Sequence, residues 1–258
     1  MNASALKIFV GALVVCAGTA VAGPTFEVIG VSTDEAKTST VAPTLVPAGP
    51  TFLQAQAVSS SRVALLWQDN SSNETFYSIE VGVSGSPTFV ASDPLPANST
   101  AAFIGALDPG VQYQFRLRAI NASGGSTYSN IVTATTLSSD SPCDTTPTAM
   151  CLENSEFRVQ AMFQAPGGDR GEAHAVKLTN DSGYLWFFSS EAVEAVVKVL
   201  DACGVNSRFW VFAGGLTNVR VLLIVTDTVA DQSKGYVNPI DVAFKPVQDT
   251  NAFDTCVR

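Results

Sequence analysis

Histidine, positive charge and long apolar runs are all scarce in this 258-residue sequence. Lys and Arg together number 14 against 23 Asp plus Glu, and they form no cluster. The electrostatic footprint of a nucleic-acid-binding protein is therefore missing, and we expect no nucleic-acid partner. Beyond the first 22 residues no stretch approaches 18 uninterrupted apolar residues, so the sequence predicts no membrane span.

The scarcity of histidine also argues against catalysis. Serine hydrolysis needs a base beside the nucleophile, and His174, the only histidine, alternates with Ala173 and Ala175 on an expected strand. Glycoside hydrolysis needs two facing carboxylates, whereas the acidic residues here are scattered through expected turns. We therefore expect no catalytic site and no cofactor. A calcium site in the Asp227–Asp231 loop or at Asp181 is a weaker alternative, since no EF-hand spacing supports it.

Residues 1–22 have the layout of a secretory signal peptide. Lys7 is followed by an apolar stretch from Ile8 to Ala17 and by the small-x-small triplet that ends at Ala22. We expect cleavage after Ala22 and a secreted or cell-surface protein. The alternative is a lipid anchor at Cys16, but the residue before that cysteine is a valine where a small residue is expected.

Four cysteines remain after the leader: Cys143, Cys151, Cys203 and Cys256. Export favours disulfides, and four cysteines allow three pairings that sequence alone cannot separate. Because Cys143 and Cys151 flank one short Thr/Pro loop, we favour Cys143–Cys151 together with Cys203–Cys256. The spacings match no zinc pattern, so no metal site is expected.

Residues 47–137 have the texture of an antiparallel β-sandwich, preceded by a spacer over 23–46 with a short strand near 26–29. Short β-branched or aromatic runs alternate with turn signals rich in Ser, Asp, Asn, Gly and Pro, which is typical of such a fold. Residues 113–119 alternate between apolar and polar side chains, as expected for a strand with one face in the core. The expected strands are 53–58, 63–68, 77–83, 88–90, 100–104, 112–119 and 131–135.

This region resembles a fibronectin type III domain. Trp67 stands where that family has the core tryptophan of its second strand, and Leu107, Pro109, Gly110 and Tyr113 match its tyrosine corner. The resemblance implies that the Tyr113 hydroxyl bonds back to the upstream backbone. It also implies a spacing or binding role in secreted proteins, but it names no ligand, and no Arg-Gly-Asp triplet is present.

A Ser/Thr/Pro linker at 138–150 separates this region from a second predicted β-domain, residues 151–258. Its expected strands are 157–164, 173–179, 184–188, 196–201, 208–213, 219–226 and 236–238, with a polar hairpin loop over 227–235. Residues 190–203 fit a helix as well as a strand, so we expect one helical turn at 191–194 followed by a strand to 201.

The second half is similar to a recurrent, usually uncharacterised C-terminal domain of exported bacterial proteins. The likeness lies in the Cys-Leu-x-x-x-x-Phe-Arg-Val opening at 151–159, the string DSGYLWFF at 181–188, the segment 196–219 and the closing DTNAF at 249–253. It implies a secreted β-domain appended to adhesion-like or protease-bearing proteins, with no assigned chemistry.

Aromatic residues of this half are the sharpest candidates for ligand binding: Tyr184, Trp186 and Trp210. Both faces of the strands that carry them are apolar, which is typical of strands buried between layers, so we expect these residues in the core. The alternatives are an aromatic platform for sugar rings, because rings stack on the apolar faces of sugars, and a protein–protein patch.

The sequence thus predicts an all-β protein of two β-sandwich domains, the first immunoglobulin-like and the second antiparallel. We expect an exported, non-catalytic binding or adhesion module whose partner is an extracellular protein or a glycan. The alternative is a carbohydrate-binding accessory protein that uses the aromatic residues of the C-terminal domain.

Overall fold

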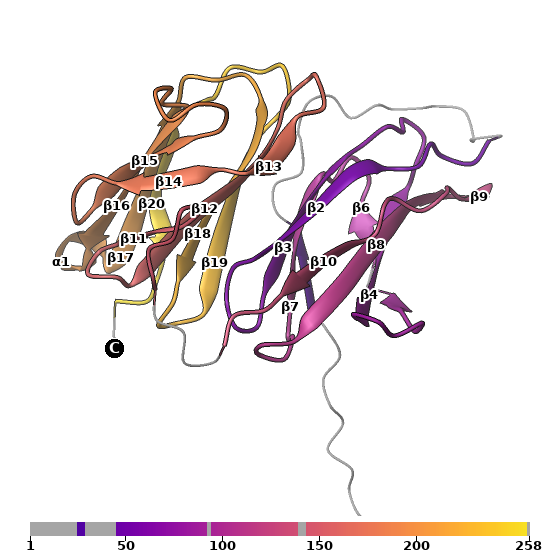
Figure 1. The fold of residues 1–258 in the computed structure, drawn as a ribbon, viewed down its shortest axis with the longest axis horizontal. Helices are drawn as coiled ribbons and strands as arrows, with labels where there is room; N and C mark the ends of the chain where they lie inside the picture. Colours follow the sequence, from indigo (N-terminus) through magenta and orange to yellow (C-terminus); the bar gives the residue numbers. More distant parts are fainter. Residues whose placement is uncertain (1–24, 29–44, 92–93, 139–142, 257–258) are drawn as a thin grey trace, which may run out of the picture.

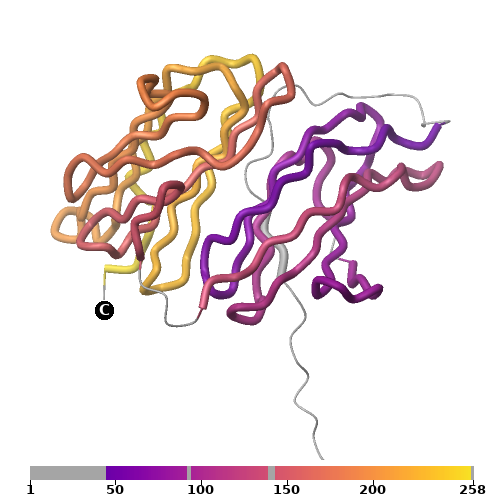
Figure 2. Tube along the Cα trace, viewed as in Figure 1, coloured from indigo at the N-terminus to yellow at the C-terminus, as the bar shows by residue number. Residues whose placement is uncertain are grey.

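The described part of the chain folds into four antiparallel sheets stacked as four layers (Figure 1). The computed structural model describes residues 25–28, 45–91, 94–138 and 143–256, and for 25–28 the backbone alone. We number the sheets I to IV in layer order, from the N-terminal sandwich to the C-terminal one. The all-β prediction is confirmed. Figure 2 shows that the chain completes the first sandwich before it begins the second.

Sheets I and II form the N-terminal sandwich. Sheet I has the strand order β10-β8-β4-β5, with β6 beside β4 and β9 beside β8, and sheet II the order β1-β7-β3-β2. The short strand expected near 26–29 is β1, which pairs with β7. The strands are β1 (Thr25–Val28), β2 (Thr51–Ala57), β3 (Val63–Gln68), β4 (Phe76–Val83), β5 (Val90–Ala91), β6 (Leu95–Pro96), β7 (Ala101–Gly105), β8 (Gln112–Asn121), β9 (Gly124–Gly125) and β10 (Val132–Thr135).

Sheets III and IV form the C-terminal sandwich. Sheet III has the order β11-β12-β18-β19, with β13 beside β12, and sheet IV the order β14-β15-β16-β17-β20. The elements are β11 (Met150–Leu152), β12 (Phe157–Gln164), β13 (Arg170–Glu172), β14 (His174–Lys177), β15 (Ser182–Trp186), β16 (Ala195–Ala202), α1 (Cys203–Asn206), β17 (Arg208–Gly215), β18 (Arg220–Asp227), β19 (Gln232–Asn238) and β20 (Val247–Phe253).

The core of the N-terminal sandwich contains Trp67, Leu107 and Tyr113 of the residues that carried the family resemblance, whereas Pro109 and Gly110 lie in the exposed corner turn. Trp67 is fully buried and makes an edge-to-face contact with Tyr77, their ring centroids 5.8 Å apart. The Tyr113 hydroxyl accepts a hydrogen bond from the backbone N–H of Asp108 at 3.0 Å, which confirms the tyrosine corner. Along β8 the burial alternates with period two, as predicted for residues 113–119.

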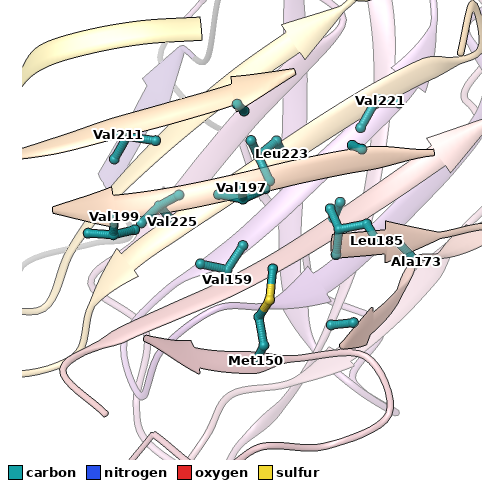
Figure 3. Close-up of a cluster of buried hydrophobic side chains, with 14 of the residues drawn as sticks. Met150, Val159, Ala173, Leu185, Val197, Val199, Val211, Val221, Leu223 and Val225 are labelled. Carbon is teal, nitrogen blue, oxygen red and sulfur yellow. The ribbon is translucent and has the colours of Figure 1, made fainter. Parts of the chain in front are cut away.

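The core of the C-terminal sandwich lies between sheets III and IV (Figure 3). Val159 of β12 and Val221, Leu223 and Val225 of β18 face Leu185, Val197, Val199 and Val211 of sheet IV. Phe157 contacts Phe209 and Phe253 at centroid distances of 4.8 and 5.2 Å. Small β-branched side chains thus fill the centre, and aromatic rings close one part of it.

A third apolar cluster joins the two sandwiches. It contains Val58, Ala64, Leu66, Ala101 and Phe103 of the N-terminal sandwich and Met162, Leu222 and Ile224 of the C-terminal one, with Val237 packed against it. Sheets II and III therefore pack on each other as well as on their own partner sheets. As a result, every residue of β7, β12 and β18 is buried.

Polar side chains border this cluster and hydrogen bond across it. The buried Arg220 guanidinium donates to the carbonyl of Trp67 at 2.7 Å and to the Gln164 side chain at 3.3 Å. Gln54 donates to the carbonyl of Phe163 at 3.2 Å. The bonds to the Trp67 and Phe163 carbonyls join strands of different sandwiches and fix how sheet II lies on sheet III, whereas Gln164 lies beside Arg220 within sheet III.

Both predicted disulfides are present. Cys143–Cys151 ties the segment before β11 to that strand, and Cys203–Cys256 ties α1 to the segment that follows β20. The second bridge closes a loop with a sequence separation of 53 residues, whereas the first spans 8.

Several local predictions for the C-terminal half are wrong. No helical turn forms at 191–194; instead the Ala192 N–H donates to the Ser189 carbonyl in a tight turn. The residues from Ala195 onward form the strand β16, whose side chains alternate between the core and the surface as a strand requires. The hairpin loop expected over 227–235 is shorter: the Asp227 carboxylate accepts the N–H groups of Val229 and Ala230, so β19 starts at Gln232. Strands β11, β13 and β20 were not predicted.

The predicted signal peptide at 1–22 and the alternative lipid anchor at Cys16 lie outside the described residues. Within the described residues, no helix has the length and apolar character needed to cross a membrane.

Removing the Phe103 side chain should weaken both sandwiches. Phe103 is 2% exposed on β7 and belongs to the cluster between the sandwiches. Phe103→Ala should lower the free energy of unfolding by about 3–5 kcal/mol, the usual cost of deleting a buried Phe side chain. Hydrogen exchange should show the loss of protection in β18 as well as in β7. The exposed Ile131 is the control, and Ile131→Ala should change stability by less than about 0.5 kcal/mol. Loss of protection confined to the N-terminal sandwich would contradict the coupling.

The two disulfides should contribute unequally. Chain-entropy arguments give about 4 kcal/mol for the Cys203–Cys256 loop and about 2.5 kcal/mol for the Cys143–Cys151 loop. Replacing each pair by alanine and measuring urea unfolding compares them directly. Equal losses would show that loop closure does not determine their contribution.

Candidate functional site

The outer face of sheet IV carries a line of aromatic side chains. Tyr184 and Trp186 alternate on β15, and Trp210 and Phe212 alternate on β17. All four are half-buried, whereas Leu185, Val211 and Ala213 between them are buried in the core. One face of each strand therefore packs into the core and the other presents rings outward.

The register of sheet IV sets these rings along a diagonal. Tyr184 of β15 pairs with Val196 of β16, and Val196 pairs with Gly214 of β17. Two residues along the strands, Ser182 pairs with Lys198, and Lys198 pairs with Phe212. Trp186 lies two residues from Tyr184 on β15, toward one end of the sheet. Trp210 lies two residues from Phe212 on β17, toward the opposite end. At about 3.3 Å per residue, Trp186 and Trp210 are roughly 20 Å apart along the strand direction. They are the two ends of an extended line and do not form one compact platform.

The expectation that Tyr184, Trp186 and Trp210 lie in the core is wrong. Strands buried on both faces do exist in this protein, but they are those of the inner sheets, where sheet II packs on sheet III. Sheet IV is an outer layer, so only its inward face is covered (Figure 1). Phe188, which strand alternation would place on the same face as Trp186, follows the end of β15 and contacts Phe163 and Phe187 instead.

Two contacts hold the terminal rings of the line. Trp210 Nε1 donates a hydrogen bond to Asn206 Oδ1 at 2.9 Å, which uses the helical turn α1 as an anchor. At the other end, the His174 ring stacks on Trp186 with centroids 3.7 Å apart and planes 7° from parallel. The only histidine of the described residues is thus a surface strand residue that supports an aromatic ring.

A hollow of about 420 Å³ lies beside the middle of the line. Gly214 leaves space because it has no side chain, and the walls are mainly apolar: Leu178, Val196, Phe212, Pro246 and Val247. Three polar side chains, Ser182, Lys198 and Gln248, also reach the hollow. Sequence reasoning did not find this feature. Its only signal was a glycine among the large side chains of β17.

The charge of Lys198 at this hollow is already paired. Its ammonium group lies 2.9 Å from the Asp181 carboxylate. A hydrogen bond from the Thr179 hydroxyl, followed by the contact with Lys198, lowers the pKa of Asp181 to about 2. Asp181 is therefore ionised at neutral pH and serves as an ion-pair partner within the surface.

The other residues considered as a calcium site have structural partners. The buried Asp227 accepts hydrogen bonds from two backbone N–H groups of its turn and from the Thr255 hydroxyl at 2.6 Å. Asp231 accepts a hydrogen bond from Ser61 of the N-terminal sandwich. Within the part of the chain that the structure describes, no group of three His, Cys, Asp or Glu residues is placed to hold a metal ion.

A second cluster, which sequence reasoning missed, lies on the outer face of sheet I. The Arg116 guanidinium lies 4.1 Å from the ring centroids of both Phe89 and Tyr128, and 2.6 Å from Glu80. Burial alone would raise the pKa of Glu80, but the hydrogen bonds from Tyr128 and Arg116 outweigh it and lower that pKa. Because these groups satisfy one another, the cluster braces β4 against β8.

Comparison with known proteins identifies the N-terminal sandwich. Residues 48–135 match the model of the fibronectin type III domain, which confirms the resemblance seen in the sequence. The model ends at residue 135, so the resemblance of the C-terminal half to an exported bacterial domain stays a prediction. A search of curated proteins found no match.

Solved structures with detectable similarity include other domains of this kind. The FN5 domain of Drosophila Lar is 18% identical over 36% of this chain and 98% of that one, with a TM-score of 0.30. The sixth fibronectin type III domain of human fibronectin type III domain containing protein 3 is 23% identical over 40% of this chain and 98% of that one, with a TM-score of 0.33.

Replacing Thr179 should raise the pKa of Asp181. Thr179→Val removes the hydrogen bond that contributes most to the low pKa of Asp181, so this pKa should move from about 2 toward the usual value of about 3.9. The ion pair with Lys198 is complete above the usual range and is lost as the pH falls through the folded-state pKa. NMR titration of the Asp181 carboxyl carbon measures the midpoint. Thr133→Val, on the N-terminal sandwich, is the control, and an unmoved midpoint in Thr179→Val would contradict the assignment.

Proposed function

We propose that this protein is an exported, non-catalytic binding module that holds a glycan chain on the outer face of sheet IV. The observation that carries the proposal is the line of four half-exposed aromatic side chains, Trp186, Tyr184, Phe212 and Trp210, on one outward face. Aromatic rings offer apolar surfaces, and Trp and Tyr add a polar edge that can hydrogen bond.

An extended ligand suits this surface better than a compact one. The line is roughly 20 Å long at the rise of a β-strand, and its ends carry the two tryptophans. A sugar chain presents successive rings with apolar faces and hydroxyl edges, so several units can contact the line at once. The strands that carry the rings are backed by the core, so the contact groups are preorganised.

The general role as a binding module rests on independent features. The fibronectin type III domain is widely used as a binding and spacing unit in extracellular proteins, and the two disulfides fit an oxidising compartment. His174 stacks on Trp186 as a ring support, which favours a binding role over a catalytic one. The interface between sheets II and III holds the two sandwiches together, so the N-terminal one acts as a fixed support for the ligand face.

Truncating the terminal rings should weaken glycan binding. Trp186→Ala and Trp210→Ala should each raise the Kd for a bound polysaccharide about tenfold, equivalent to ~1.4 kcal/mol, because anchoring aromatic residues dominate such contacts. Screening plant, fungal and bacterial polysaccharides by affinity electrophoresis gives the ligand, and calorimetry gives the Kd.

Phe89→Ala is the matched control for this experiment. Phe89 is also a half-exposed aromatic residue, but it lies at sheet I, so its loss should leave the Kd unchanged. Iodide quenching adds a second readout: Trp67 is fully buried, so the quenchable emission comes from Trp186 and Trp210 and should be protected by the ligand. The proposal is refuted if no polysaccharide retards the protein in the gel, or if Phe89→Ala weakens binding as much as the two tryptophan substitutions do.

A further inference from the structure

The hollow beside the aromatic line has the lining of a selective subsite. Seven of its lining side chains are apolar, and three polar ones, Ser182, Lys198 and Gln248, reach the same space. Lys198, Phe212 and Gln248 are neighbours on three adjacent strands, so an apolar ring stands between two hydrogen-bonding side chains. Apolar walls with a few converging polar groups are typical of small-ligand sites.

The charge at the hollow favours a neutral group. Lys198 is the cation there, and its ammonium group is 2.9 Å from the Asp181 carboxylate. The Thr179 hydroxyl also donates a hydrogen bond to the Asp181 carboxylate, which favours its ionised form and so supports the pair. An acidic ligand would have to compete with Asp181, and a purely hydrocarbon one would cover the polar side chains at the hollow without pairing them, which is costly.

We infer that this hollow binds the acetamido group of an N-acetylated sugar; the inference rests on the glycan function proposed above. The methyl group has apolar contacts available at Val196 and Phe212. The carbonyl oxygen can accept from Lys198 or from the Gln248 amide, and the N–H can donate to the Gln248 carbonyl. An unsubstituted hexose has only hydroxyls at that position and would leave the apolar walls uncovered.

Gly214 allows a direct test because the hollow can be filled without disturbing the fold. A Cβ built on Gly214 meets no atom closer than Val196 Cγ2 at 4.0 Å, and its backbone is outside the positive-φ region. Gly214→Leu therefore places a side chain in the hollow. Gly167→Leu is the matched control, because a Cβ there has open space and Gly167 lies in the turn between β12 and β13, away from the ligand face.

The experiment compares two β-1,4-linked tetrasaccharides that differ at one substituent, chitotetraose and cellotetraose, by calorimetry on the full chain. We expect chitotetraose to bind at least tenfold more tightly. Gly214→Leu should remove this preference while leaving the Kd for cellotetraose within about twofold, and Gly167→Leu should keep the preference. Circular dichroism of both variants checks that they fold.

The outcomes separate this inference from the function on which it rests. Equal affinity for the two sugars, or an equal loss of both in Gly214→Leu, overturns the acetamido subsite but leaves glycan binding in place. Binding of neither sugar, nor of any polysaccharide in the screen, overturns both. Sedimentation that shows a dimer dissociated by Gly214→Leu would assign the hollow to contact between two copies of the chain and would also overturn the inference.

Discussion

The packing of sheet II on sheet III is the contact on which the rest of this structure depends. It buries β7, β12 and β18 on both faces and turns two sandwiches into one four-layer body. Because the two inner sheets are covered, the broad surfaces that remain outward are those of sheets I and IV (Figure 1). The face of the fibronectin type III domain that includes β3 and β7 is consequently occupied within the chain itself. Any partner must use an outer sheet, an edge or a loop.

Polar groups give this contact its direction. Apolar side chains such as Leu222 and Ile224 would tolerate some sliding of one sheet over the other, since the hydrophobic effect is non-directional. Arg220 is different, because burial lowers its pKa and its guanidinium donates to one particular carbonyl, that of Trp67. A buried cation that loses such a partner is costly, so a shifted register would be penalised. Trp67, whose side chain lies in the N-terminal core, thus accepts a hydrogen bond at its carbonyl from the C-terminal sandwich.

The sequence predicted local structure well and failed where the answer depends on which layer covers which. Alternation along 113–119, the turn residues around Tyr113 and the cysteine spacing each reflect local geometry, and those strands, the tyrosine corner and the disulfides are confirmed. The apolar runs on β15 and β17 look like those on β3 and β18, yet the first pair is half-exposed and the second is buried. That difference comes from the contact between distant sheets, which no local pattern encodes. The edge strand β20 was missed because its middle four residues, 248–251, are all polar and give no apolar alternation. The predicted domain limits and the leader stay predictions.

The same placement explains why aromatic residues on sheet IV suggest a ligand. A large ring on a water-facing strand loses part of its hydrophobic contribution, and a fold selected for stability alone has no need of four of them on one outward face. Here the terminal rings are also held in place, by Asn206 at one end and by His174 at the other, which restricts side chains that partial exposure would leave freer to change rotamer. Rings that are already fixed lose little further entropy when a ligand binds. The core between sheets III and IV backs the strands that carry the aromatic line, and the contact between sheets II and III fixes that sandwich to the N-terminal one.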